Sequence, residues 1–235
     1  SRSDSVVDVA MLESAVRNHL NNHAPRAMCV LRPIKLVLTN FERREDLVVA
    51  NHPSDEAQGS RRVPFTQELL IDQEDFREEA NKKYKRLVLG KRVRLRGAYV
   101  VEAERCEKDD SGQVTIVYAR VIEGTLGEDP ADGIKPKGVI HWVSASEGLQ
   151  ATVRVYDRLF SDPNPGRADD VLAVVNPQSL EVVETAVIEP SLSQAHPEQV
   201  FQFEREGYFV ADRYDHTESQ PVFNMTIGLR DVWAE

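Results

Sequence analysis

The segment that could do chemistry is KKYKRLVLGKRVRLR, residues 82–96, which holds eight basic residues in fifteen and no acidic one. The whole chain has 235 residues, with 39 acidic against 29 basic side chains and a formal net charge of −10. Outside this basic segment the charge is −18, because 21 basic residues remain against the 39 acidic ones. Most of the surface would repel phosphate, which argues against a general polyanion binder but allows one positive face.

The residue types of the basic segment suit a nucleic acid. Arginine forms bidentate hydrogen bonds to bases and phosphates, whereas lysine supplies a point charge. Alternation puts Arg92, Arg94 and Arg96 on one side of a strand, and Tyr84 offers a ring for base stacking. The alternative is a solvated helix end followed by an edge strand that arginines protect. The shared face, the tyrosine and the absence of acids favour RNA or DNA.

Signals of enzymatic chemistry are essentially absent from the sequence. No phosphate-binding glycine motif, GxSxG elbow or paired-histidine metal motif occurs. His141, in VIHWVS, has no partner at ligand spacing, so we expect a packed or surface residue. Glu204 and Glu206 could form an acid pair, but alternation predicts that both lie on one solvated face of a strand.

The cellular setting follows from what the chain lacks. No run approaches the 18 or more apolar residues of a membrane span, and the first ten residues hold no apolar region of a secretory signal. Cys29 and Cys106 have no motif partner. We therefore expect a cytoplasmic protein with no membrane partner, two reduced thiols, no disulfide and no structural metal.

Two helices are predicted to position these residues. From Asp8, a plausible N-cap, apolar residues recur at positions 9, 12, 16 and 20, and this helix must end near Asn22 because Pro25 disfavours helix before it. A second helix is predicted at residues 72–84, whose acids crowd the first half and whose lysines crowd the end.

Most of the remaining chain alternates with a period of two, which predicts strands. Many short strands with few helices are typical of barrels or sandwiches. The fold class is therefore mainly β, with two β-domains and a boundary near residues 123–137. The predicted strands are 92–105 and 113–122, joined by the acidic turn 108–112, then 138–145, 151–160, 180–188, 200–210 and 221–233.

Longer blocks of the sequence resemble the bacterial glutaminyl-tRNA synthetases. The blocks include NNHAPRAM, DFREEANKKYKRLVLGK, VRLR, KGVIHWVSA, YDRLF, PNPG, FQFEREGYF and GLRDVWA, and the resemblance covers essentially the whole chain. It implies two anticodon-binding β-barrels, similar to a ribosomal protein that binds 5S rRNA, after a short helical segment. Residues 1–25 would end a helical linking subdomain, 26–126 would form the first barrel and 127–235 the second. Strand exchange between the barrels is allowed, for instance near residues 26–40.

The resemblance also implies a function. The family's class I signatures, H-I-G-H and a K-M-S-K-S-like loop, do not occur here, so the chain looks like the C-terminal anticodon-binding region without the catalytic domain. ATP and Mg²⁺ are then expected only in that missing domain, with no cofactor and no aminoacylation in this chain. The implied partner is the anticodon stem-loop of tRNA-Gln, with the anticodon CUG or UUG, and we expect a monomer.

Five residues match family positions at the middle and third anticodon bases. Arg26 matches a residue at the middle base, and Gln202 and Glu204 match residues that line the middle-base pocket. Lys85 and Arg86 match residues at the third base.

Other matched positions surround these bases. Arg94 and Arg96 match residues around the first base, and Asn21 matches a residue that supports the anticodon loop. Ser54 stands where an asparagine is usual, and Lys83 stands where a glutamine is usual, so Lys83 favours phosphate contact over base contact. Two alternatives stay open: a non-catalytic domain whose basic strand docks an acidic protein, and a stand-alone 5S rRNA-binding protein, which fits the barrel type but not the length or the leading helix.

Overall fold

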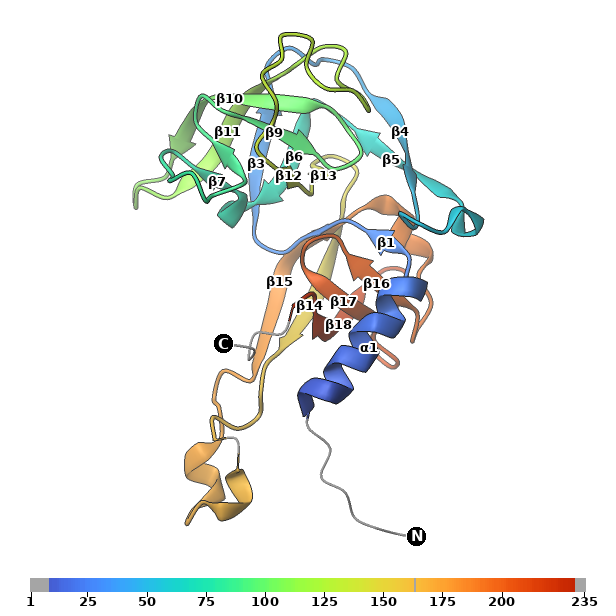
Figure 1. Cartoon of the computed structure of the whole chain (residues 1–235), viewed down its shortest axis with the longest axis vertical. Coiled ribbons are helices and arrows are strands. Elements are labelled where there is room, and N and C mark those ends of the chain that lie inside the picture. Colours follow the sequence, from blue (N-terminus) through green and yellow to red (C-terminus); the bar gives the residue numbers. More distant parts are fainter. Residues whose placement is uncertain (1–8, 163, 231–235) are drawn as a thin grey trace.

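Two seven-stranded β-sheets make up most of the described part of the chain, and an α-helix precedes them (Figure 1). The structure is a computed structural model and describes residues 9–162 and 164–230. The predicted fold class, mainly β with two barrel-like sheets after a short helix, is confirmed. Among the described residues, no helix is long and apolar enough to cross a membrane.

The first sheet packs around an aromatic centre. Phe65 is fully buried, and its ring meets those of Phe41 and Trp142 edge-on at centroid distances of 4.8 and 5.0 Å. The short hairpin of β4 (Glu45–Ala50) and β5 (Ser60–Phe65) and the pair of β7 (Phe76–Arg77) and β8 (Leu87–Val88) flank this sheet. The sheet order is β12 (Val139–Ile140), β9 (Arg92–Leu95), β10 (Val100–Lys108), β11 (Val114–Val121), β3 (Pro33–Leu38), β6 (Glu68–Asp72) and β13 (Val143–Ser144).

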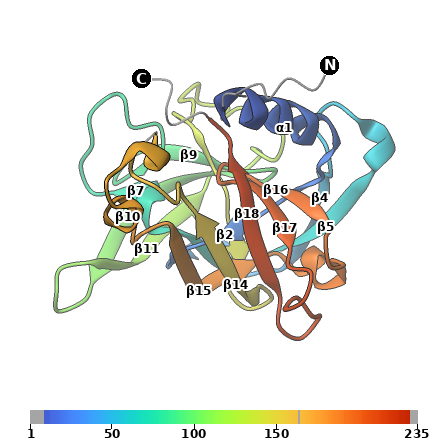
Figure 2. The ribbon, with the colours of Figure 1, turned by 90° about the horizontal axis from the view of Figure 1, so that it is seen from below.

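The second sheet has its own core, in which Phe203 stacks on Phe209 at 4.5 Å and meets Phe223 edge-on at 5.2 Å. Figure 2 shows its longer strands side by side. Figure 1 shows that the connection between β14 and β15 extends away from the rest of the sheet. The sheet order is β1 (Arg26–Ala27), β16 (Val200–Phe203), β17 (Gly207–Ala211), β18 (Val222–Gly228), β14 (Leu149–Tyr156), β15 (Leu180–Ile188) and β2 (Cys29–Val30).

The chain crosses between the sheets more than once. The strands β1 and β2, near the start of the chain, belong to the second sheet, whereas β12 and β13, after residue 138, belong to the first. β1 pairs with β16 in parallel, which sets Arg26 opposite Gln202. The division between residues 126 and 127 stays a prediction, although β12 and β13 return to the first sheet after that point.

The first predicted helix is confirmed as α1 (Val9–His23), while Asp8 lies outside the described residues. Val16 and Leu20 pack beside Tyr208 and Ile227, and the Nε of Arg17 donates to the carbonyl of Gly228 at 2.9 Å. Helix α1 therefore lies against the second sheet.

The second predicted helix, residues 72–84, is wrong. Asp72 ends β6, and Gln73–Asp75 form a short 3-10 turn before β7. The side chain of Asp72 accepts hydrogen bonds from the backbone N–H groups of Arg32 and Glu74, and Asp75 is buried. Tertiary partners therefore override the helical charge pattern, since both carboxylates face inward.

Three predicted strands are each interrupted. Residues 92–105 divide at a turn where Gly97 has φ +66°, a left-handed conformation that glycine adopts without steric cost. Residues 138–145 divide into β12 and β13 around His141 and Trp142. Residues 200–210 divide into β16 and β17, with Arg205 in the turn at φ +71°. The expectation that Glu204 and Glu206 share one solvated strand face is therefore wrong.

Other strand predictions agree with the structure. The acidic turn joins β10 to β11, β15 (Leu180–Ile188) coincides with the predicted strand, and β14 starts two residues early and ends at Tyr156. β18 ends at Gly228, and the last predicted residues, 231–233, lie outside the described part.

Replacing Phe65 with alanine should lower the free energy of unfolding by about 3–5 kcal/mol, because it removes a buried ring and leaves a cavity. Val48→Ala is the matched control on the neighbouring strand, since Val48 is 67% exposed, and should cost less than about 1 kcal/mol. Urea unfolding of both variants measures the difference. Equal, small losses would contradict the aromatic centre.

Candidate nucleic-acid interface

The loop that carries the first half of the basic segment borders a groove of about 560 Å³. Five basic side chains line this basic groove against one acid, Glu74. The five come from two places, since four belong to residues 77–86 near the first sheet and one comes from the β16–β17 turn of the second. They are Arg77, Lys83, Lys85, Arg86 and Arg205.

Arg86 and Tyr84 are held at the wall of the basic groove by one backbone carbonyl. The Nη1 of Arg86 and the hydroxyl of Tyr84 donate to the carbonyl of Glu74 at 3.0 and 2.7 Å. Burial, helped by the negative charge of Asp75, raises the pKa of Tyr84 to about 12, so its hydroxyl remains a donor. The guanidinium of Arg77 lies 4.7 Å from the centre of the Tyr84 ring. The predicted third-base residues therefore lie in a preformed wall.

A second group of predicted residues joins the two sheets. The Nε of Arg96 lies 3.5 Å from Oε2 of Glu204, and the Nε1 of Trp142 fixes the backbone of Arg96 through its carbonyl at 2.9 Å. Within the described part of the chain, the buried Oε1 of Gln202 accepts no hydrogen bond, and the buried Nε of Arg96 has the long ion-pair contact with Glu204 but no hydrogen bond. Buried polar atoms are nearly always paired, so these two mark a place where a polar ligand would be stabilised.

Arg26, the first residue of β1, lies just after helix α1, and its side chain caps the last turn of the helix. Its guanidinium donates to the carbonyls of Ala24 and Asn21 at 2.7 and 2.9 Å, and to the side-chain oxygen of Asn21 at 3.0 Å. The residue is 7% exposed, and burial lowers the pKa of its guanidinium. A cation at this position also complements the helix dipole.

Ser54, the remaining predicted residue near the end of helix α1, contacts Asn21 through a histidine. The ring of His52 contacts the Asn21 carbonyl at 3.0 Å and receives the backbone N–H of Ser54 at 3.3 Å. The hydroxyl of Tyr208 donates to the side-chain oxygen of Asn21 at 3.2 Å. Asn21 is therefore fixed from three sides.

The uniformly positive arginine face predicted for residues 92–96 is not what the structure shows. Arg92 is buried and bonded to Glu102 at 2.8 Å and to both oxygens of Asp132 at 2.7 Å. Arg94 is held by a set of backbone carbonyls, those of Ala98, Thr125 and Glu128. These two arginines organise the first sheet and the loop that follows it.

The unpaired charge of the basic segment belongs to its lysines. Lys82, Lys83, Lys85 and Lys91 form no ion pair with any residue in 9–162 or 164–230. Three of them lie in residues 81–86, a stretch that is mostly exposed. The positive potential is therefore concentrated at the loop beside the basic groove.

Comparison with known proteins identifies the family of this chain. Two family models described as "tRNA synthetases class I (E and Q), anti-codon binding domain" match residues 24–122 and 139–212. The chain belongs to these anticodon-binding domains. It is 57% identical over 237 residues to a glutamine–tRNA ligase of Colwellia psychrerythraea, 56% over 236 residues to that of Aliivibrio fischeri and 55% over 236 residues to that of Escherichia coli O157:H7.

Each alignment covers the whole of this chain but only 42–43% of the relative, so the chain spans less than half the length of the glutamine–tRNA ligases that it matches. The recognised family agrees with the resemblance found in the sequence. It does not assign a base to any residue, so the base contacts stay predictions.

Under the basic groove of this anticodon-binding domain lies a buried ionic cluster that the sequence did not predict. Asp75 accepts two hydrogen bonds from Arg205, whose Nη1 also lies 3.2 Å from Nδ1 of His141. The Nε2 of His141 faces Oε1 of Glu206 at 3.5 Å. Burial, together with the charge of Arg205, lowers the pKa of His141 to about 3, so His141 is neutral. It is one of the two kinds expected, a packed residue and not a surface one. Burial and the charges of Asp72 and Asp75 raise the pKa of Glu206 to about 7.

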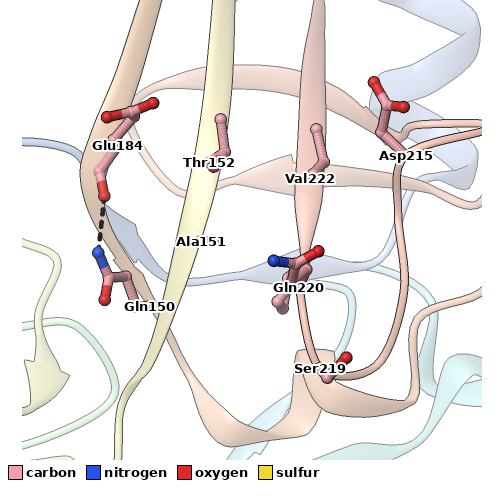
Figure 3. A pocket seen from close by; sticks show the side chains of 9 residues that line it. Gln150, Ala151, Thr152, Glu184, Asp215, Ser219, Gln220 and Val222 are labelled. Carbon is pink, nitrogen blue, oxygen red and sulfur yellow. Dashed lines mark hydrogen bonds between the residues drawn. The ribbon is translucent and has the colours of Figure 1, made fainter.

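Another groove of the described chain lies elsewhere and has another character (Figure 3). Its volume is about 610 Å³, and none of the predicted site residues lines it. Its two charged lining residues are Glu184 and Asp215, Gln150 donates to the carbonyl of Glu184 at 3.0 Å, and none of its described lining residues is basic. A groove of this charge repels phosphate, so it is a poor candidate for RNA.

Several residues of the interface were missed by sequence reasoning. Arg205 lies within the matched block FQFEREGYF, beside Gln202 and Glu204, and this position was the available signal. Asp75, His52 and Tyr208 reach the interface only through contacts with residues far along the chain, and no local spacing reveals such contacts.

Glu206 should make stability depend on pH. Its folded pKa of about 7 exceeds the ordinary value of 4.5, so the folded state holds the proton more tightly, and this stabilisation is lost as pH rises from about 4.5 to above 7. The loss should reach at most about 3 kcal/mol. The neutral side chain of Glu206→Gln does not lose this stabilisation. The free energy of unfolding of Glu206→Gln, relative to that of the unchanged protein, should therefore increase as pH rises over this range, as measured by urea unfolding.

Glu123→Gln is the control, because Glu123 is exposed. Its stability difference from the unchanged protein should stay flat between pH 4.5 and 8. A flat difference for Glu206→Gln as well would show that water solvates the Glu206 carboxylate.

Proposed function

We propose that this anticodon-binding domain holds the anticodon stem-loop of tRNA-Gln and reads the anticodon CUG or UUG. The observation that carries the proposal is the buried Oε1 of Gln202, which accepts no hydrogen bond within the described residues, together with the buried Nε of Arg96, which lies 3.5 Å from Glu204 without a hydrogen bond. Gln202 belongs to the second sheet, and Arg96 follows β9 of the first. A base edge supplies both donors and acceptors and would satisfy a guanidinium N–H and an amide oxygen together.

The lysines of the loop position the RNA, and other side chains read it. Lys82, Lys83 and Lys91 offer point charges to the phosphate backbone, a contact that carries no sequence information. Lys85 and Arg86 lie on the wall of the basic groove and would contact the third base, with Tyr84 as a stacking surface.

The middle base would be read by the corner where β1 meets β16. Arg26 and Gln202 are register partners there, and Glu204 lies at the end of β16. Asn21 and Ser54 would support the anticodon loop, since Asn21 accepts a hydrogen bond from Arg26 just after helix α1 and Ser54 contacts Asn21 through His52. Arg94 and Arg96 would lie around the first base, although the guanidinium of Arg94 must act while it holds the loop carbonyls.

The acidic remainder of the chain limits binding to other RNA, because only the lysine-rich face attracts phosphate. We propose that glutamine, ATP and Mg²⁺ are handled by parts of the relatives that this chain does not cover, and that this chain alone has no cofactor and does not aminoacylate. It would act as a monomer, in the cytoplasm.

Two alanine variants separate a base-reading residue from a phosphate contact. Arg86→Ala should weaken binding of tRNA-Gln by about 1–3 kcal/mol and weaken a copy altered only at the third anticodon base by less. Lys91→Ala should weaken both RNAs about equally and make the slope of log K against log salt shallower by up to roughly 0.7. Fluorescence anisotropy titrations at several salt concentrations measure both effects. If Arg86→Ala lowers both affinities by one factor, Arg86 is only an electrostatic contact.

A further inference from the structure

Asp75 is a buried anion on which cations from both sheets converge. It ends the 3-10 turn that follows β6 of the first sheet and is 1% exposed. Arg205, from the β16–β17 turn of the second sheet, donates Nη2 to Oδ1 at 2.8 Å and Nη1 to Oδ2. Arg86 approaches the same Oδ1 with its Nε at 3.3 Å. One carboxylate therefore fixes two guanidinium groups of the basic groove.

This geometry explains how two like charges lie together in one groove. Arg86 and Arg205 both line it, and two guanidinium groups so placed repel each other unless an anion lies between them. The bidentate bond from Arg205 also fixes the plane of its guanidinium, as paired N–H···O bonds do. Arg205 has a positive φ, which is uncommon for a residue with a side chain, so the turn is held by its contacts.

We propose that Asp75 is a positioning residue that couples recognition of the third base, through Arg86, to recognition of the middle base, through the turn that follows Gln202 and Glu204. The inference rests on the proposed function. It adds that selectivity at one anticodon position depends on a residue of the other sheet. Asp75 touches no base in this account and acts only through the two arginines.

A purely structural role is the competing explanation, because breaking a buried ion pair also destabilises a fold. Asp72 provides the matched control. It is buried in the same segment, yet its oxygens accept hydrogen bonds from two backbone N–H groups, those of Arg32 and Glu74, and it forms no ion pair within the described residues. Asp72→Asn should therefore disturb stability without releasing either arginine.

The test compares the unchanged chain, Asp75→Asn and Asp72→Asn in binding to three RNAs: tRNA-Gln, a copy altered at the third anticodon base and a copy altered at the middle base. Asp75→Asn should reduce both discrimination ratios by about fivefold or more, since each well-formed base contact supplies at least that much selectivity. Asp72→Asn should leave both ratios unchanged, even if its melting temperature falls. Asp75→Asn combined with Arg86→Ala should be no less selective at the third base than Arg86→Ala alone.

The outcomes are distinguishable. If the unchanged chain does not discriminate among the three RNAs, the proposed function fails and the coupling fails with it. If the unchanged chain discriminates and Asp75→Asn keeps both ratios, the coupling alone is overturned.

Should Asp75→Asn not fold, Arg205→Lys replaces it, because lysine keeps the positive charge and removes the bidentate bond to Asp75. It should lower discrimination at the third base, and an unchanged third-base ratio would overturn the coupling.

Discussion

Residues 27–31 pass between the cores of the two sheets and contribute side chains to both. The relative position of the two sheets, and therefore the candidate interface that they form, depends on this segment. Its side chains alternate: Met28 and Val30 pack into the core of the first sheet, whereas Ala27, Cys29 and Leu31 pack into that of the second. Because extended residues alternate in direction, one short segment ties both cores together. Buried Glu189 reinforces it by accepting the backbone N–H of Met28 at 2.8 Å. The sheets are thus held as one unit, with side chains of both at the basic groove.

The arginines and the lysines of the basic segment have different roles. Its arginines are mostly paired inside the protein, Arg92 with Asp132 and Glu102, Arg86 with Asp75 and Arg96 with Glu204. Arginine suits such partly buried pairs because its planar fork matches a carboxylate. The lysines stay solvated, where long-range attraction to phosphate costs little desolvation. The number of basic residues in the segment is therefore larger than the number of unpaired positive charges. The unpaired charges nevertheless lie within this segment.

The sequence predicted those features that depend on local spacing. Helix α1, the β10–β11 hairpin and β15 follow from periodicity and turn residues, and the two-barrel fold came from family resemblance. The helix at residues 72–84 failed because Asp72 and Asp75 turn inward toward Arg32 and Arg205, partners that local charge patterns cannot show. The strand at 200–210 failed because a positive φ at Arg205 makes a turn without glycine. The candidate residues were named from the resemblance, but their grouping into one corner and one groove depends on pairings such as Arg26 with Gln202, 176 positions apart in sequence.

The most direct test of an anticodon-reading surface is a competition experiment with the unchanged chain at fixed, moderate salt. Labelled tRNA-Gln is displaced by unlabelled tRNA-Gln, by a non-cognate tRNA that differs at all three anticodon bases, and by 5S rRNA. We expect tRNA-Gln to compete at least about tenfold better than either other RNA, because base contacts add to a shared phosphate attraction. Equal competition by all three would mean that the basic groove reads charge alone. Preference for 5S rRNA would indicate a ribosomal-type barrel, and no RNA binding would leave an acidic protein as the partner of the basic segment.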